Sequence, residues 1–116
     1  MKKIGFIGLG NMGSKMVINL LKANYEVIGY DINESFTNSL VPSGLKKASN
    51  LTEFSTDIKI LITMLPNGEI VETVYNNVIN NFKKNTLFVD CSTIDVDRAK
   101  DLHEKCNKNG LLSLDA

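Results

Sequence analysis

The chain has 116 residues, 43% of them hydrophobic and 22% charged, and its 13 Lys and Arg residues balance its 13 Asp and Glu residues. This length and composition predict one globular domain over residues 1–116 and exclude an enzyme of two complete domains. A net charge of zero, with no basic run longer than two residues, leaves no electrostatic footprint for nucleic acid or an anionic membrane, so we expect neither as a partner.

The cysteines and the first residues of the chain bear on its cellular setting. Cys91 and Cys106 stand fifteen positions apart, which matches neither a zinc site nor a disulfide framework, so we expect two free thiols and no metal. The sequence passes directly into patterned structure without a signal or transit segment. Its longest uncharged apolar run, residues 60–66, is too short to span a membrane. We therefore expect a cytoplasmic protein.

Short apolar runs rich in Ile, Val and Phe alternate with longer stretches of helical period. In chain order the expected elements are a strand at 4–8, a helix at 11–23, a strand at 26–30, a helix at 34–41, a short strand at 45–49, a helix of a turn or two ending at 54, a strand at 58–65, a helix around 70–79, a strand at 86–90, a helix at 94–108 and a strand at 111–114. This alternation predicts a doubly wound α/β sheet of Rossmann type, with about six mostly parallel strands and helices on both faces. A ligand site is then expected at the carboxyl ends of the strands.

A glycine-rich motif, Gly-Leu-Gly-Asn-Met-Gly at residues 8–13, follows the first strand directly and opens the first helix. Its context is that of a dinucleotide-binding loop, because an acidic residue, Asp31, ends the next strand eighteen positions later. We expect Gly8 to permit the tight turn, Gly10 to admit a diphosphate close to the backbone, and Gly13 to let the helix pack closely on the sheet. The amides of Asn11 and Met12 then point at the phosphates.

Asp31 has two interpretations. As a ligand, its carboxylate accepts hydrogen bonds from the adenosine ribose hydroxyls, which selects NAD because a 2′-phosphate there would be repelled. Residues 32–36 contain a second acid and no base, which favours NAD over NADP. Alternatively, Asp31 caps the helix that follows it.

Residues 6–20, FIGLGNMGSKMVINL, resemble the amino-terminal signature of the β-hydroxyacid dehydrogenases, the family of 3-hydroxyisobutyrate dehydrogenase. Val17 departs from this pattern, since the family usually has Ala or Ser there. Residues 61–66 resemble the end of the family's fourth strand, and residues 90–95 resemble its Asp-x-Ser-Thr motif. Residues 114–116 match the start of its Asp-Ala-Pro-Val-Ser-Gly-Gly segment, so the resemblance covers the whole chain.

The resemblance implies roles for particular residues. The implied cofactor-binding residues are Gly8, Leu9, Gly10, Asn11, Met12, Gly13, Asp31, Met64, Leu65, Pro66 and Thr93. Leu65 and Pro66 would border the nicotinamide-side ribose, and Ser92 would touch the substrate. A simpler alternative is that Ser92 and Thr93 only cap the helix that follows.

The family resemblance also implies an activity: reversible hydride transfer between NAD and a short 3-hydroxy acid. In the family the catalytic Lys and an all-helical second domain lie beyond the segment that this chain covers, so we assign no catalytic residue here. His103 lies in the middle of a predicted helix, and Cys91 lacks the positive neighbour that a reactive thiol needs. We expect this chain alone to be inactive and the full-length enzyme to be a homo-oligomer.

Other functions remain open at this point. Within the same family, a semialdehyde or glyoxylate reductase, or an enzyme of 6-phosphogluconate dehydrogenase type, would share these motifs. A non-catalytic dinucleotide-sensing module would share the glycine loop and the acidic strand end. A methyltransferase is disfavoured because its glycine loop usually lacks the packing position that Gly13 fills.

Overall fold

The six strands form a single sheet in the computed structural model, which describes residues 3–54 and 57–115. In chain order the strands are β1 (Lys3–Ile7), β2 (Glu26–Tyr30), β3 (Lys46–Lys47), β4 (Ile60–Thr63), β5 (Leu87–Asp90) and β6 (Leu112–Asp115). Their order across the sheet is β3-β2-β1-β4-β5-β6, and every neighbouring pair is parallel. The predicted doubly wound sheet is confirmed. The strand order reverses between β1 and β4, which is where such sheets bind their ligands.

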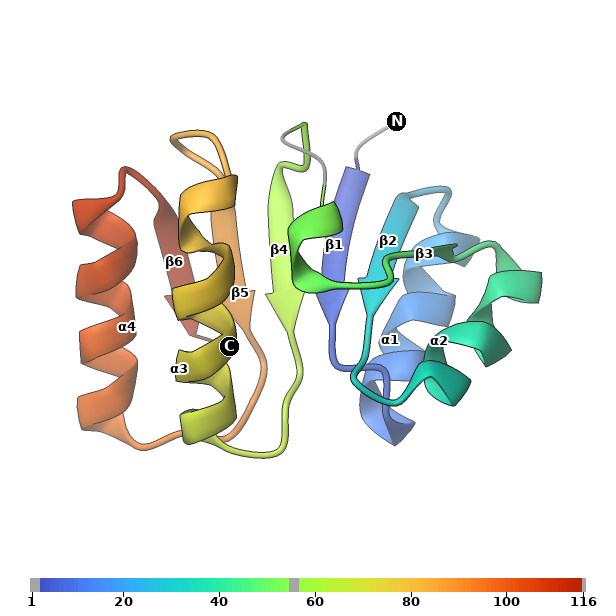
Figure 1. Ribbon diagram of the computed structural model, residues 1–116, viewed down its shortest axis with the longest axis horizontal. Helices are drawn as coiled ribbons and strands as arrows, with labels where there is room; N and C mark the ends of the chain where they lie inside the picture. The colour runs from blue at the N-terminus through green and yellow to red at the C-terminus, as the bar shows by residue number, and fades with distance from the viewer. Residues whose placement is uncertain (1–2, 55–56, 116) are drawn as a thin grey trace.

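Helices cover both faces of the sheet (Figure 1). The four helices are α1 (Asn11–Lys22), α2 (Glu34–Leu40), α3 (Gly68–Val78) and α4 (Val96–Lys108), and three short 3-10 turns occupy Val41–Ser43, Leu51–Glu53 and Ile79–Asn81. Helices α1 and α2 pack on one face, over β1 and β2, where Phe6, Val17, Val27 and Leu40 share a buried cluster. Val17, which departs from the family pattern, is fully buried in this cluster.

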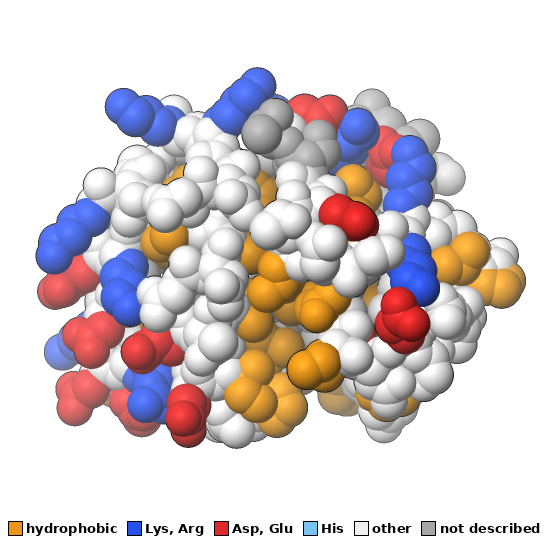
Figure 2. All heavy atoms as spheres, viewed as in Figure 1, with side chains coloured by type: hydrophobic (Ala, Val, Ile, Leu, Met, Phe, Trp, Pro, Cys, Tyr) orange, Lys and Arg blue, Asp and Glu red, His pale blue; other side chains and the backbone are white. Residues whose placement is uncertain are grey.

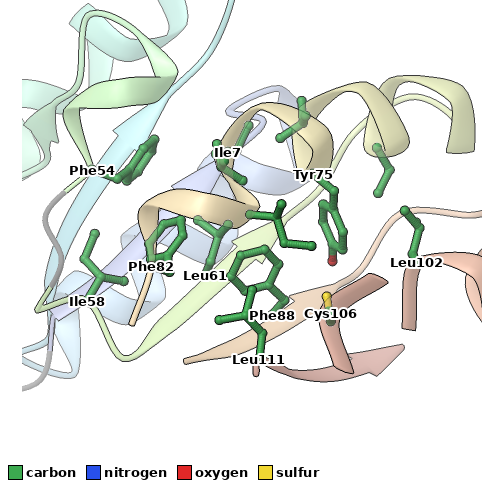
Figure 3. Packing of buried hydrophobic residues seen from close by; sticks show 14 of the residues in the cluster. Ile7, Phe54, Ile58, Leu61, Tyr75, Phe82, Phe88, Leu102, Cys106 and Leu111 are labelled. Carbon is green, nitrogen blue, oxygen red and sulfur yellow. The ribbon is translucent and has the colours of Figure 1, made fainter. Parts of the chain in front are cut away.

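The opposite face carries the larger core, under α3 and α4 (Figure 3). At its centre lies the fully buried ring of Phe88 from β5. Tyr75 of α3 and Phe82 meet this ring edge-on, with centroids 5.2 and 5.3 Å away. Such edge-to-face contacts add about 0.5–1.5 kcal/mol each to the burial of the rings. They hold α3 against β5 and so position the strand ends beyond them.

Most element boundaries differ from the predicted ones by a residue or two. Helix α4 starts two residues later than predicted, at Val96, and is capped by Asp95, whose side chain accepts a hydrogen bond from the Arg98 amide. The predicted cap by Ser92 and Thr93 is therefore wrong. Helix α2 ends at Leu40 because Pro42 follows, and the chain continues as a 3-10 turn.

Two predicted strands are shorter in the structure. The strand predicted at 45–49 is reduced to β3, a two-residue edge strand paired only with β2. The strand predicted at 58–65 is reduced to β4 because its apolar run continues past the paired residues into the loop. Among the described residues, no helix is both long and apolar enough to cross a membrane.

Candidate functional site

A cleft of about 860 Å³ opens at the carboxyl end of the sheet, between the glycine loop and α3. The walls come from the loop after β1, the end of β2, the loop after β4 and one side of α3. Figure 2 shows hydrophobic side chains gathered in a hollow at this end of the sheet, between α3 and the α2 side of the molecule. The cleft thus lies at the predicted position, beside the point where the strand order reverses.

The glycine loop makes two close approaches to neighbouring backbone. Gly8 has a φ of +102°, and a Cβ there would lie 2.1 Å from the carbonyl oxygen of Met64. A Cβ on Gly13 would lie 2.0 Å from the carbonyl oxygen of Gly8. Both positions therefore need glycine, and the tight turn and the close helix approach predicted for them are confirmed. A Cβ on Gly10, in contrast, would meet no atom within 4 Å and would point into open space.

The first turn of α1 presents unused hydrogen-bond donors to the cleft. Gly10 is the N-cap and offers no side-chain acceptor, and the first turn holds no acidic residue. Within the described part of the chain, the amides of Asn11, Met12 and Gly13 have no hydrogen-bond partner, whereas the Ser14 amide donates to Gly10. These three amides and the positive end of the helix dipole can bind a diphosphate. A dinucleotide diphosphate fits here because Gly10 leaves the space in front of them empty.

Asp31 stands at the end of β2 with its carboxylate beside the glycine loop. Its Oδ2 accepts a hydrogen bond of 2.7 Å from the Leu9 amide, and its Oδ1 accepts one of 2.8 Å from the Asn33 amide. The interpretation of Asp31 as a helix cap is wrong, because the side chain of Asn33 caps α2 by accepting from the Ser35 amide. Each carboxylate oxygen keeps a lone pair for a further donor from the cleft. Leu9 contributes only its backbone, since its side chain is buried in the core.

The predicted residues at the ends of β4 and β5 are joined by one partly buried hydrogen bond. Met64, Leu65 and Pro66 line the cleft. The Leu65 amide donates to Ser92 Oγ at 2.7 Å. Ser92 is only 6% exposed, and neither it nor the exposed Thr93 is among the residues that line the cleft.

One wall of the cleft escaped the sequence analysis. Ile70, Thr73 and Asn77 of α3 line the cleft, as does Ile32, which follows β2. Two of these residues are unusual in a way that the sequence does not reveal. Ile32 is 91% exposed and Ile70 is 38% exposed, although both side chains are large and apolar. Exposed apolar side chains on opposite walls can hold a flat aromatic ring between them.

The charges around the cleft favour a dinucleotide without a 2′-phosphate. Asp31 and Glu69 line it, and its lining holds no Lys, Arg or His within the described ranges. His103 lies away from the cleft on α4, in contact with Ser113 and Asn107. Within residues 3–54 and 57–115, no three His, Cys, Asp or Glu side chains lie close enough together to hold a metal ion.

Comparisons with known proteins point to one family. The sequence model described as the NAD binding domain of 6-phosphogluconate dehydrogenase matches residues 3–116. The mitochondrial 3-hydroxyisobutyrate dehydrogenase of Drosophila melanogaster is 37% identical over 116 residues, covering 99% of this chain and 36% of that protein. The NAD-dependent L-serine dehydrogenase of Pseudomonas aeruginosa is 36% identical over 119 residues, covering all of this chain and 40% of that protein.

A solved structure gives the same result in three dimensions. The 3-hydroxyisobutyrate dehydrogenase of Mycobacterium tuberculosis, solved with L-serine, superposes with a TM-score of 0.96 at 37% identity. The match covers 100% of this chain and 40% of that one. The chain therefore spans well under half the length of the relatives that it matches.

Proposed function

The chain belongs to the family of the NAD binding domain of 6-phosphogluconate dehydrogenase, and from this premise we propose that it is the cofactor-binding part of an NAD-dependent 3-hydroxy acid dehydrogenase. The observation that carries the proposal is the geometry at the start of α1. Three amides without a partner among the described residues lie at the cleft there, and a Cβ on Gly10 would point into open space. Diphosphates bind at such helix starts in dinucleotide-binding folds.

In this proposal each wall of the cleft holds a different part of NAD. The amides of Asn11, Met12 and Gly13 bind the diphosphate, and the carboxylate of Asp31 accepts hydrogen bonds from the adenosine ribose. The apolar side chains of Ile32 and Ile70 flank the adenine ring. This assignment leaves the carboxyl end of β4 for the nicotinamide half.

The nicotinamide side is assigned to the segments after β4 and β5. Met64, Leu65 and Pro66 border the nicotinamide and its ribose, and their position in the cleft lining supports this role. Thr93 would contact the cofactor, and Ser92 would contact the substrate. The bound cofactor supplies the hydride acceptor, while Leu65 and Ser92 fix where its reactive ring lies. The acid/base group that moves the hydroxyl proton would come from the part of the enzyme that relatives have in addition to this segment.

The substrate class follows from the relatives. One is named for 3-hydroxyisobutyrate and another for L-serine, and both compounds are short carboxylic acids with a hydroxyl on the third carbon. We propose the same class here, with residues 1–116 as one dinucleotide-binding domain that is inactive by itself. The proposed compartment is a reducing one such as the cytoplasm, which suits two cysteines, Cys91 and Cys106, that are not joined in a disulfide.

Titration of NADH and of NADPH into the chain tests the proposal. Binding is followed by the emission of the reduced nicotinamide, because the protein has no Trp. We expect saturable binding of NADH, with NADPH weaker by about tenfold or more because of the charge of Asp31. Lack of binding of either cofactor at millimolar concentration would contradict the proposal. In the full-length enzyme, NAD-dependent oxidation of 3-hydroxyisobutyrate and L-serine tests the substrate class.

A further inference from the structure

A buried carboxylate joins the ends of β4 and β5 directly behind the cleft. We propose that Asp90 is a positioning residue: acting through Thr63 and Ser92, it fixes the Leu65 segment against which the nicotinamide half of the dinucleotide lies. This inference rests on the proposed function and adds to it a residue that does not line the cleft.

The contacts form one continuous chain of hydrogen bonds. Thr63 and Asp90 are partners in the sheet register, and Thr63 Oγ1 donates to Asp90 Oδ1 at 2.7 Å. The same oxygen accepts from the Ser92 amide at 3.2 Å, which turns the chain after β5. Ser92 Oγ then accepts from the Leu65 amide at 2.7 Å. The loop after β4 is thereby tied to the loop after β5 by side chains, beyond the last paired residues of both strands.

The depth of these groups makes the connection firm. Thr63, Asp90 and Ser92 are 0%, 4% and 6% exposed. Water therefore does not compete for their hydrogen bonds, and a buried donor or acceptor that loses its partner is costly. The segment that they hold is also in tight contact with the glycine loop, since the Met64 carbonyl would lie 2.1 Å from a Cβ on Gly8. A displacement of Leu65 would be transmitted to this side of the cleft.

The two oxygens of Asp90 have different surroundings. Oδ1 accepts both hydrogen bonds, whereas Oδ2 is buried and has no partner in the part of the chain that the structure describes. Asp90 also lines a second cavity, of about 350 Å³, between α4 and the ends of β5 and β6. The positioning role therefore depends on acceptance by Oδ1 and not on the second oxygen.

The experiment separates the two halves of the dinucleotide by comparing NADH with ADP, which contains the adenosine and diphosphate but not the nicotinamide half. Affinities of the chain for both are measured by calorimetry. Thr63→Val removes the donor to Asp90, and Ser92→Ala removes the acceptor for the Leu65 amide. Asp90→Ala removes the acceptor for Thr63 and for the Ser92 amide, and Asp90→Asn is its conservative counterpart, which keeps an oxygen in the Oδ1 position. Thr86→Val is the matched control, because Thr86 is equally buried, donates to the Lys83 carbonyl and precedes β5 at its far end.

We expect Asp90→Ala, Thr63→Val and Ser92→Ala to weaken NADH binding by about fivefold or more while changing ADP binding by less than about twofold. Asp90→Asn and Thr86→Val should bind NADH within about twofold of the unsubstituted chain. Circular dichroism verifies folding, and Ser92→Ala decides the matter if Thr63→Val does not fold. The inference is overturned if NADH affinity is unchanged in Asp90→Ala or in Ser92→Ala, or if ADP affinity falls in parallel. If the unsubstituted chain binds neither NADH nor ADP, the proposed function itself fails and this inference with it.

Discussion

Gly10 and Gly13 are glycines for different physical reasons. Gly13 has no room for a Cβ because the Gly8 carbonyl occupies the place, whereas Gly10 has ample room within the protein. The space beside Gly10 is therefore available to a ligand. Glycine at position 13 is therefore needed for the stability of the fold, whereas glycine at position 10 is needed for ligand binding.

Alanine at each position tests that contrast. We expect Gly13→Ala to destabilise the fold by about 1–3 kcal/mol, because helix α1 must move away from the loop. Gly10→Ala should change stability by less than about 1 kcal/mol, since its φ of −69° suits any residue. Both variants should lose NADH binding by about tenfold or more. Urea unfolding and NADH titration measure the two effects, and retention of full NADH affinity by Gly10→Ala would contradict the diphosphate assignment.

Ile32 offers a test of cofactor selection without a folding cost. It is 91% exposed, lines the cleft and follows Asp31 directly. Ile32→Arg places a guanidinium where a 2′-phosphate would lie, so we expect the affinity for NADPH relative to NADH to rise by about threefold to tenfold. Ile32→Gln is the control, because it adds polarity without charge. Equal cofactor ratios in the two variants would argue against adenosine binding on this side of the cleft.

The sequence sufficed to predict residues whose function depends on local spacing. The glycines of residues 8–13 and Asp31 were identified because a motif places them at the ends of consecutive strands. The hydrogen bond between Thr63 and Asp90 could not be predicted in this way. It depends on the register between β4 and β5, which is set by packing of residues far apart in the sequence.

At the scale of elements, helix α4 illustrates the same limit. Its apolar period was visible, including Leu102 and Cys106, which both pack in the core. The sequence predicts its start at residue 94, because Ser92 and Thr93 are common cap residues. In the structure Asp95 is the cap, and Ser92 Oγ instead accepts a hydrogen bond from the Leu65 amide. The tertiary hydrogen bond between Ser92 and Leu65 thus takes the place of the local cap that the sequence predicts.

Cys106 makes the packing of α4 sensitive to high pH. Burial raises the pKa of its thiol from the ordinary 9.0 to about 11. The unfolded chain therefore releases this proton at lower pH than the folded chain, so the stabilisation is complete below pH 9 and is lost as the pH rises toward 11. The loss amounts to about 2 kcal/mol.

Urea unfolding of the chain at pH 8 and at pH 10.5 measures this effect. The comparison is with Cys106→Ala, which shares all other groups that titrate in this range. We expect the stability advantage of the unsubstituted chain over Cys106→Ala to shrink by about 1–2 kcal/mol between the two pH values. Cys91→Ala should lose as much stability between pH 8 and pH 10.5 as the unsubstituted chain does. A difference that does not change with pH would show that the thiol ionises equally in both states.

At the scale of the whole molecule, the sheet is covered unequally. Helices α3 and α4 cover one face, but α1 and α2 lie over β1 and β2 at the other end of the opposite face. On that face Leu112 and Leu114 of β6 are 52% and 55% exposed, beside the half-buried Leu87 and Val89 of β5. Parallel sheets are normally covered on both sides. The apolar face of β5 and β6 departs from that rule.

We expect this face to make the chain associate with itself. Contiguous exposed apolar surface on an edge strand promotes association between copies. Sedimentation velocity between about 5 and 500 µM should show a rising mean mass, because the loss of solvent-exposed leucine surface favours the associated state. Leu112→Lys combined with Leu114→Lys should abolish the rise, since two charges would have to be buried in the contact. Ile32→Lys, which charges an exposed apolar site beside the cleft, should leave it unchanged. A mass that stays constant for the unsubstituted chain would show that the chain does not associate. Association that survives the double substitution would show that the contact uses another surface.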